Sequence, residues 1–262
     1  MPRFAANLTM LFSDLPYLDR HAAAAKAGFA AVEVQFPYET PAGAIASELK
    51  DHGLRQVLIN MPPGNWAAGD RGMAAIPGRE AEFRETVELG LHYARVLGCP
   101  RLHVMHGILP ARADPVACHE TLVANLRYAC ARAAEQGATL LIEPLNPRDN
   151  PGYPVNTQAQ GHAICAAVGA PNLKVQMDFY HVQIVEGDIA NRIRRYLPGV
   201  GHIQIAGVPE RHEPDESNEV NYPYLFALLD RIGWDGWVGA EYWPRGDTLD
   251  GLGWAKAWRI GL

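Results

Sequence analysis

Cysteine, long apolar runs and excess positive charge are all scarce in this sequence, and each shortage excludes a class of protein. The cysteines form no CxxC pair, so neither a zinc motif nor a disulfide framework is indicated; they are Cys99, Cys118, Cys130 and Cys165. No apolar run approaches the roughly 18 residues that a membrane helix needs. The N-terminal segment has Asp14 and Pro16 where a signal peptide would continue its apolar core. We therefore expect a cytoplasmic protein with reduced structural thiols and no membrane partner.

Basic residues are outnumbered by acidic ones. The sequence holds 23 Lys and Arg against 29 Asp and Glu, a net charge of -6, and it has no long basic run. Nucleic-acid binders carry basic surfaces, so we expect no nucleic-acid partner.

The length of 262 residues suits one α/β barrel, which typically takes about 250 residues. No Ser/Gly-rich linker divides the chain, so we expect residues 1–262 to form one domain. Whether it assembles as a homo-oligomer stays open.

Short β-rich runs alternate with longer helical stretches along the whole chain. We predict strands at 4–8, 31–35, 56–60, 102–105, 139–143, 174–178, 202–205 and 237–241. We predict helices at about 15–27, 41–52, 78–97, 114–136, 157–169, 187–196, 220–232 and 248–259. Eight such units favour a closed, parallel (β/α)8 TIM barrel, and a doubly wound open sheet is the alternative.

Four of these strands end in a polar residue that a buried strand would not otherwise need. The four, which we call the strand-end quartet, are Glu143, Asp178, Gln204 and Glu241. They are spaced by about one βα unit, so they should lie at equivalent heights on strands five to eight. Successive residues of a strand face opposite sides. On each of these four strands, the residue just before the quartet member faces the other side and is apolar. We therefore expect the quartet to converge on the barrel axis.

Three carboxylates in one small space would repel each other unless a cation lay between them. Carboxylate and amide oxygens favour a hard divalent ion, Mg²⁺ or Mn²⁺, over zinc. The alternative is that each residue caps a helix or forms a salt bridge there. Because unpaired buried carboxylates are costly, four in register favour a metal site.

Other polar residues lie close to the same strand ends. His181 follows Asp178 by three residues and could donate to a substrate or support the metal site. Arg211, in the long segment 206–223, is a candidate for binding a substrate carboxylate, since a guanidinium binds such a group through two hydrogen bonds. Segments 61–78 and 206–223 are both long for βα connections and could act as lids.

Several long motifs resemble the hydroxypyruvate isomerase family, which includes the 2-oxotetronate isomerases and belongs to the xylose-isomerase-like barrels. The resemblance covers essentially the whole chain, and these motifs carry it: RFAANLTMLF, AGDRGMAAIPGRE, NLRYA, LIEPLN, QMDFYH, GHIQIAGVPERHEP, NYPYLF, GWVGAEYWPRG and GLGW. Some motifs are similar to the hydroxypyruvate branch, and others, among them HVMHGILPAR and WPRG, are similar to the 2-oxotetronate branch. The resemblance implies the barrel fold and isomerisation of a small sugar acid.

The resemblance also implies roles for individual residues. Glu143 and Glu241 would be the catalytic acid/base pair, and both would also lie at the metal, with Asp178 and Gln204 completing the site. Hydroxypyruvate would give tartronate semialdehyde, or 2-oxotetronate would give 3-oxotetronate, by proton transfer through a cis-enediolate. The alternatives are a ketose 3-epimerase, a metal-dependent abasic-site endonuclease, and a sugar-acid binding protein without turnover.

Overall fold

The computed structural model describes residues 2–258, 260 and 261. Its eight strands are β1 (Arg3–Asn7), β2 (Ala31–Val34), β3 (Arg55–Asn60), β4 (Arg101–His103), β5 (Thr139–Ile142), β6 (Leu173–Asp178), β7 (Val200–Ile205) and β8 (Trp237–Ala240). They pair in sequence order, and β8 pairs with β1 in parallel, which closes the barrel. The predicted (β/α)8 barrel is therefore confirmed, and the open sheet is excluded.

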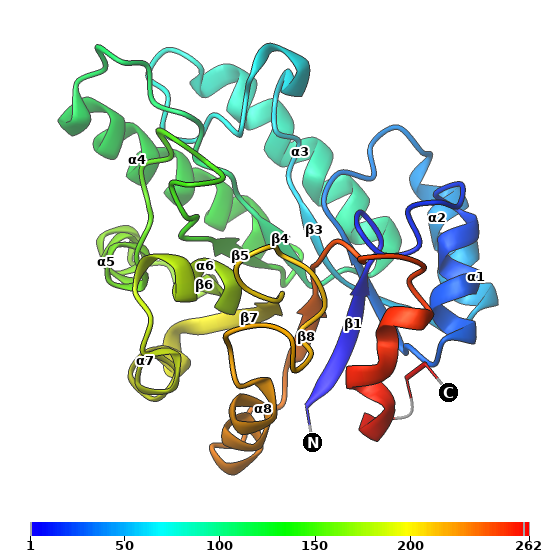
Figure 1. Cartoon of the computed structure of the whole chain (residues 1–262). Helices are drawn as coiled ribbons and strands as arrows, with labels where there is room; N and C mark the ends of the chain where they lie inside the picture. The colour runs from blue at the N-terminus through cyan, green and yellow to red at the C-terminus, as the bar shows by residue number, and fades with distance from the viewer. Residues whose placement is uncertain (1, 259, 262) are drawn as a thin grey trace.

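Helices follow the strands and cover the outside of the barrel (Figure 1). The α-helices are α1 (Asp19–Lys26), α2 (Ala42–Asp51), α3 (Glu80–Leu97), α4 (Pro115–Ala134), α5 (Gln158–Val168), α6 (Phe179–Val185), α7 (Ile189–Tyr196) and α8 (Tyr222–Arg231). Short 3-10 helices are η1 (Trp66–Ala68), η2 (Leu197–Gly199) and η3 (Asp250–Trp258). Among the described residues, no helix combines the length and the apolar character that a bilayer crossing requires.

The last predicted helix differs from the structure in type. Its described residues form the 3-10 helix η3 rather than an α-helix, and residue 259 lies outside the described part. Gly251 and Gly253 weaken an α-helix here, because glycine loses more backbone entropy than other residues on folding. Even so, η3 lies between α8 and α1 (Figure 1) and takes the place of the eighth helix. Trp254 packs edge-on against Phe4 of β1, which covers the outside of the barrel at this point.

The barrel separates apolar and polar residues as the alternation predicted. The residues expected to face the helices on strands five to eight all lie in the main hydrophobic core: Leu140, Ile142, Val175, Met177, Ile203, Ile205, Val238 and Ala240. A second, small apolar cluster of Ala5, Ala31 and Val57 lies inside the barrel at its N-terminal end. Above it the interior becomes polar, so the buried polar side chains lie nearer the C-terminal ends of the strands.

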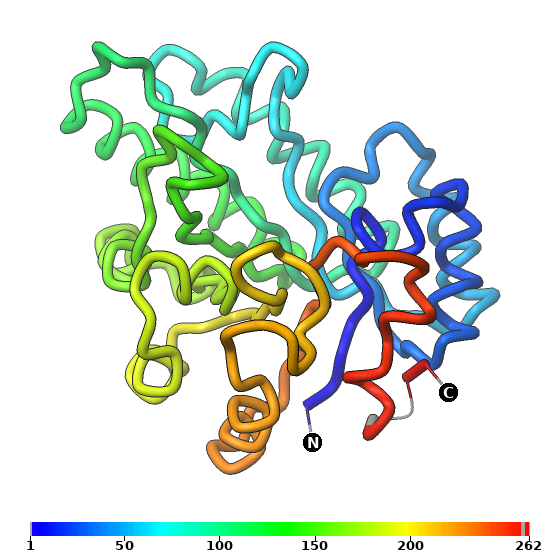
Figure 2. The backbone as a smooth tube through the Cα atoms, in the orientation of Figure 1, coloured from blue at the N-terminus to red at the C-terminus, as the bar shows by residue number. Residues whose placement is uncertain are grey.

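Segment 61–78, the first of the two long βα connections, is held in place by contacts within the protein. Segment 61–78 is held by a bidentate ion pair between Asp70 and Arg79, with distances of 2.7 and 2.8 Å. In Figure 2 this segment crosses the top of the view, and both chain ends lie in the lower half. Gly72 (φ 92°) pairs with His106 in the connection after β4, and a Cβ there would lie 2.2 Å from the backbone oxygen of Met105. The segment therefore packs directly on the neighbouring strand connection.

Candidate active site at the mouth of the barrel

The strand-end quartet lies at the C-terminal mouth, and all four side chains are buried, at most 5% exposed. The register of β6 and β7 places Asp178 directly beside Gln204. Glu143 and Glu241 come immediately after β5 and β8. Shared neighbours link the four, since Arg211 contacts both Asp178 and Glu241, and His181 contacts both Glu143 and Asp178. The mouth therefore holds three carboxylates and one amide close together.

Asp178 does two things at the end of β6. Its Oδ1 accepts a hydrogen bond of 2.9 Å from the backbone N–H of Tyr180 and so caps α6, a helix that we did not predict. Its Oδ2 is buried and has no hydrogen-bond donor within the described part of the chain. The helix-cap alternative is thus correct for one oxygen of Asp178, while the other accepts no hydrogen bond there and has Arg211 and His181 3.6 Å away.

Glu143 has few partners of its own. Its Oε1 is buried without a hydrogen bond among the described residues, 3.9 Å from His181 Nε2, and its Oε2 lies 3.7 Å from His103 Nδ1. Burial raises the pKa of Glu143 well above its usual range, and the neighbouring carboxylates Glu241 and Asp178 raise it further. A cation among these oxygens would offset both the burial of the carboxylate charge and the repulsion between the carboxylates.

Arg211 reaches the carboxylates from the segment after β7. Its backbone is in the left-handed region (φ 61°), and its side chain is only 17% exposed. The guanidinium donates to Glu241 Oε2 at 2.5 Å, lies 3.6 Å from Asp178 Oδ2 and stacks over the ring of Tyr180. Arg211 is therefore a buried cation at the mouth and not a solvated loop residue.

His181, in α6, has a fixed arrangement of its ring nitrogens. Its Nδ1 accepts a hydrogen bond of 3.1 Å from the backbone N–H of Asn146. Burial lowers the pKa of His181 well below its usual value, and Arg211 adds to the effect, so the ring is neutral. A neutral imidazole that accepts at Nδ1 carries its proton on Nε2. His181 Nε2 therefore presents an N–H toward Glu143 and Asp178.

Donor atoms suited to a divalent metal ion are present at the mouth. One ligand atom each from Glu143, Asp178 and His181 lie within 4.8 Å of one another. The proton on His181 Nε2 suits this residue to a supporting role as a donor, with the carboxylates as the ligand candidates. Gln204 Oε1 accepts from Gln176 Nε2 at 2.6 Å. An amide oxygen has a second lone pair, so Gln204 can still act as a ligand.

Glu33 is a site residue that our strand-end reasoning missed. It is fully buried in β2 and accepts hydrogen bonds from Asn7, Gln204 and His202. The signal was present, because a glutamate in the middle of the apolar run AVEV is costly unless it is paired. His202, which lies deeper than Gln204, bonds to Glu33 at 2.7 Å, as expected for a residue that is not a metal ligand.

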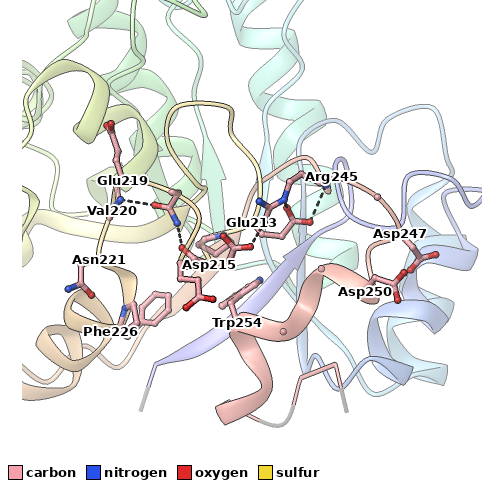
Figure 3. Close-up of a pocket in the computed structure, with 17 residues that line it drawn as sticks. Glu213, Asp215, Glu219, Val220, Asn221, Phe226, Arg245, Asp247, Asp250 and Trp254 are labelled. Atoms are coloured by element: carbon pink, nitrogen blue, oxygen red, sulfur yellow. Dashed lines mark hydrogen bonds and ion pairs between the residues drawn. The ribbon is translucent and has the colours of Figure 1, made fainter.

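The segment that carries Arg211 is tied to the connection after β8. Arg245 donates to the buried carboxylate of Glu213 at 2.9 Å and also pairs with Asp215. Figure 3 shows these side chains at the edge of a cavity of about 930 Å³ between the two segments. No quartet member lines this cavity, nor do His181 and Arg211. Its charged lining residues are six carboxylates and one arginine, so it would repel an anion.

Comparisons with known proteins agree with this fold. The family model described as Xylose isomerase-like TIM barrel matches residues 21–258. A 2-oxo-tetronate isomerase of Cupriavidus necator is 58% identical over 98% of this chain and 98% of its own. The hydroxypyruvate isomerase of Escherichia coli is 42% identical over 99% of this chain and 100% of its own.

Solved structures show the same architecture. A crystal structure from Brucella melitensis, named as an AP endonuclease of family 2, has a TM-score of 0.97 and 52% identity, and the match covers 99% of this chain and 100% of that one. A 3-keto-D-glucoside 4-epimerase from E. coli, at 20% identity and a TM-score of 0.80 over 99% of this chain and 98% of that one, shares the fold. The chain therefore belongs to the hydroxypyruvate isomerase family of xylose isomerase-like TIM barrels, and it is an isomerase.

Proposed function

We propose that this isomerase interconverts 2-oxotetronate and 3-oxotetronate by proton transfer between neighbouring carbons, with a divalent metal at the mouth of the barrel. The observation that carries the proposal is the burial of two glutamates, Glu143 and Glu241, in one cluster with further oxygen donors. Two 2-oxo-tetronate isomerases, at 58% and 48% identity, support this substrate. Hydroxypyruvate, which also has a carboxylate beside a ketone and a carbinol, is the second candidate substrate.

The donor set fits a hard cation. The strand-end quartet would hold Mg²⁺ or Mn²⁺ through oxygen atoms, which these ions prefer. The buried oxygens Glu143 Oε1 and Asp178 Oδ2, which accept no hydrogen bond among the described residues, support this assignment, because such oxygens are costly to bury. Such an ion would supply Lewis-acid polarisation of the substrate's carbonyl and hydroxyl oxygens when bound.

The two glutamates supply the proton transfers. One takes the proton from the carbinol carbon C3 of 2-oxotetronate, and the electron pair left behind forms a cis-enediolate across C2 and C3. The other returns a proton to C2, and the hydroxyl proton moves from the oxygen on C3 to the oxygen on C2. Their surroundings differ, since Glu241 is paired with Arg211 and Glu143 is not hydrogen-bonded at Oε1. Different surroundings allow two carboxylates to divide acid and base roles.

His181 and Arg211 would orient the substrate. The Nε2–H of His181 can donate to a substrate oxygen, because Asn146 occupies its Nδ1. The guanidinium of Arg211, which is buried beside Glu241 and Asp178, offers further N–H groups for the substrate carboxylate. A charged donor at this depth favours an acid over a neutral ketose.

Three rival functions lack this support. A ketose carries no carboxylate, so a ketose 3-epimerase would not need a guanidinium to bind one. An endonuclease acting on abasic sites would need several histidine ligands and a basic face, but the cluster found among the described residues holds one histidine and the chain is acidic. A binding protein without turnover would not need two proton-transfer groups in the same mouth.

The test is product analysis with 2-oxotetronate, hydroxypyruvate and a ketohexose, each with Mg²⁺, with Mn²⁺ and after chelation. We expect metal-dependent turnover of 2-oxotetronate, weaker turnover of hydroxypyruvate and none of the ketohexose. Turnover of the ketohexose alone would assign the chain to the epimerases. Metal binding without turnover of any substrate would favour the binding protein.

A further inference from the structure

A fourth carboxylate lies on the barrel axis beneath the proposed ligands. Glu33 is 0% exposed, and its Oε1 accepts hydrogen bonds from Gln204 Nε2 at 2.7 Å and from Asn7 Nδ2 at 2.9 Å. Its Oε2 lies 2.7 Å from His202 Nε2. These contacts come from β1, which pairs with β2, and from β7 across the barrel, so the carboxylate is held in one position.

This contact fixes which end of the Gln204 amide points upward. Oε1 of Glu33 accepts from both Gln204 Nε2 and Asn7 Nδ2, so the NH₂ group of Gln204 faces Glu33. The amide oxygen then lies on the opposite side, where it accepts from Gln176 Nε2 at 2.6 Å and keeps one lone pair. A flipped amide would set two acceptor oxygens 2.7 Å apart, which is strongly unfavourable in a buried site.

We propose that Glu33 is a positioning residue that holds the amide oxygen of Gln204 toward the metal ligands at the mouth. This role depends on the proposed function, because it requires Gln204 to be a ligand. Glu33 itself would touch neither metal nor substrate. Hydrogen-bond partners behind a ligand orient it and are worth about 10- to 100-fold in metal affinity.

Gly239 of β8 provides the space for this carboxylate. A Cβ on Gly239 would lie 2.3 and 2.4 Å from the two carboxylate oxygens of Glu33. The register places Gly239 directly beside Gln204. The glycine therefore lets Glu33 extend from β2 past β8 to Gln204 of β7, and a methyl group there would push the carboxylate away from Gln204 without removing any polar group.

The experiment is a double-mutant cycle of Mn²⁺ affinity, measured by calorimetry on the full chain. The variants are Glu33→Ala, Gln204→Ala and the double variant. We expect Glu33→Ala to weaken Mn²⁺ binding by about 10- to 100-fold, and to change it by less than about threefold when Gln204 is already alanine. Glu33→Gln, which keeps an oxygen for Gln204 to donate to, should restore most of the affinity.

Two further variants separate positioning from loss of stability. Gly239→Ala should also weaken Mn²⁺ binding, although it removes no hydrogen bond. Asn172→Ala is the matched control, since this side chain bonds two backbone oxygens near the opposite end of the barrel, and it should lower the melting temperature but leave the affinity unchanged.

The outcomes distinguish the two proposals. Wild-type protein that binds no Mn²⁺, or a Gln204→Ala variant that binds it normally, would overturn the proposed ligand set and the role of Glu33 with it. If Gln204→Ala weakens binding but Glu33→Ala has the same effect with and without Gln204, the ligand set stands and the positioning role of Glu33 is wrong.

Discussion

Glu143 and Glu241 are alike in chemistry and different in surroundings. Glu241 accepts hydrogen bonds from Asn7, Gln35 and Arg211, whereas Oε1 of Glu143 has no donor among the described residues. Replacing either by glutamine keeps the shape and removes the ionisable group. We expect Glu143→Gln and Glu241→Gln each to lower kcat by about 10²- to 10⁴-fold, the usual contribution of a proton-transfer group.

Steady-state kinetics with 2-oxotetronate at saturating Mn²⁺ would measure these losses, and circular dichroism would check the fold. A matched control is Gln158→Glu, a change at another buried position, in α5, which should leave kcat unaffected if the variant folds. Retention of more than about a tenth of the wild-type kcat by either glutamine variant would contradict its role as a proton-transfer group.

Arg211 is expected to select acids. Removing a charged hydrogen-bond donor costs about 1.5–3 kcal/mol, so Arg211→Ala should lower kcat/KM for 2-oxotetronate by about 10- to 100-fold. Turnover of a neutral ketose should not fall, since it offers no carboxylate to lose. Arg84→Ala, a change at an exposed arginine of α3, is the control. Unchanged kcat/KM on the acid would favour an epimerase.

Site residues differed in how far the sequence could reveal them. The strand-end quartet was predictable, because buried polar residues one βα unit apart must end parallel strands at one edge. Glu33 was visible as a charge inside an apolar strand, but its hydrogen-bond partners come from two other strands, β1 and β7. The approach of Arg211 was not predictable, because it depends on a left-handed backbone and on contacts distant in sequence.

At the scale of elements, the segment after β7 positions Arg211 through its link to the connection after β8. Arg245→Gln would break the contact with Glu213, whose carboxylate is buried. We expect amide exchange across residues 207–220 to rise by about tenfold or more, since a hydrogen bond to a charged group contributes about 1.5–3 kcal/mol. Hydrogen–deuterium exchange with mass spectrometry would measure it.

Exchange in segment 61–78, held separately by Asp70 and Arg79, is the internal control and should not change. Equal protection of residues 207–220 in both proteins would show that Arg245 does not hold this segment. A parallel rise in both segments would instead indicate general destabilisation.

Most elements were predictable, and the differences have local causes. Apolar runs of four to six residues between helix end signals identified all eight strands to within about two residues. Helix α6 was missed because Asp178 serves as both strand end and helix cap, which leaves no loop between the two. The last helix was predicted in the right place, but two glycines make it a 3-10 helix.

At the scale of the whole molecule, burial of neutral histidines makes stability depend on pH. On the outside of the barrel, His162 of α5 stacks on Tyr196, and burial lowers its pKa to about 4. The unfolded chain takes up a proton near pH 6.5, whereas the folded chain resists it to about pH 4. The free energy of unfolding should therefore fall as the pH drops through this window.

Replacement of His162 by phenylalanine keeps the ring and removes the titration. We expect His162→Phe to lose less stability than wild type between pH 6.5 and pH 4, whatever its stability at pH 7. Urea unfolding at a series of pH values would measure the difference. Parallel pH profiles for the two proteins would contradict a lowered pKa at this histidine.

The central claim is that protons leave and return to neighbouring substrate carbons through carboxylates at the mouth of one barrel. The most direct test is turnover of 2-oxotetronate in D₂O with Mn²⁺, followed by mass spectrometry of the product. We predict solvent deuterium on carbon C2 of 3-oxotetronate, and its loss in both Glu143→Gln and Glu241→Gln. Efficient turnover with no deuterium in the product, early or late, would indicate a hydride shift and contradict the account.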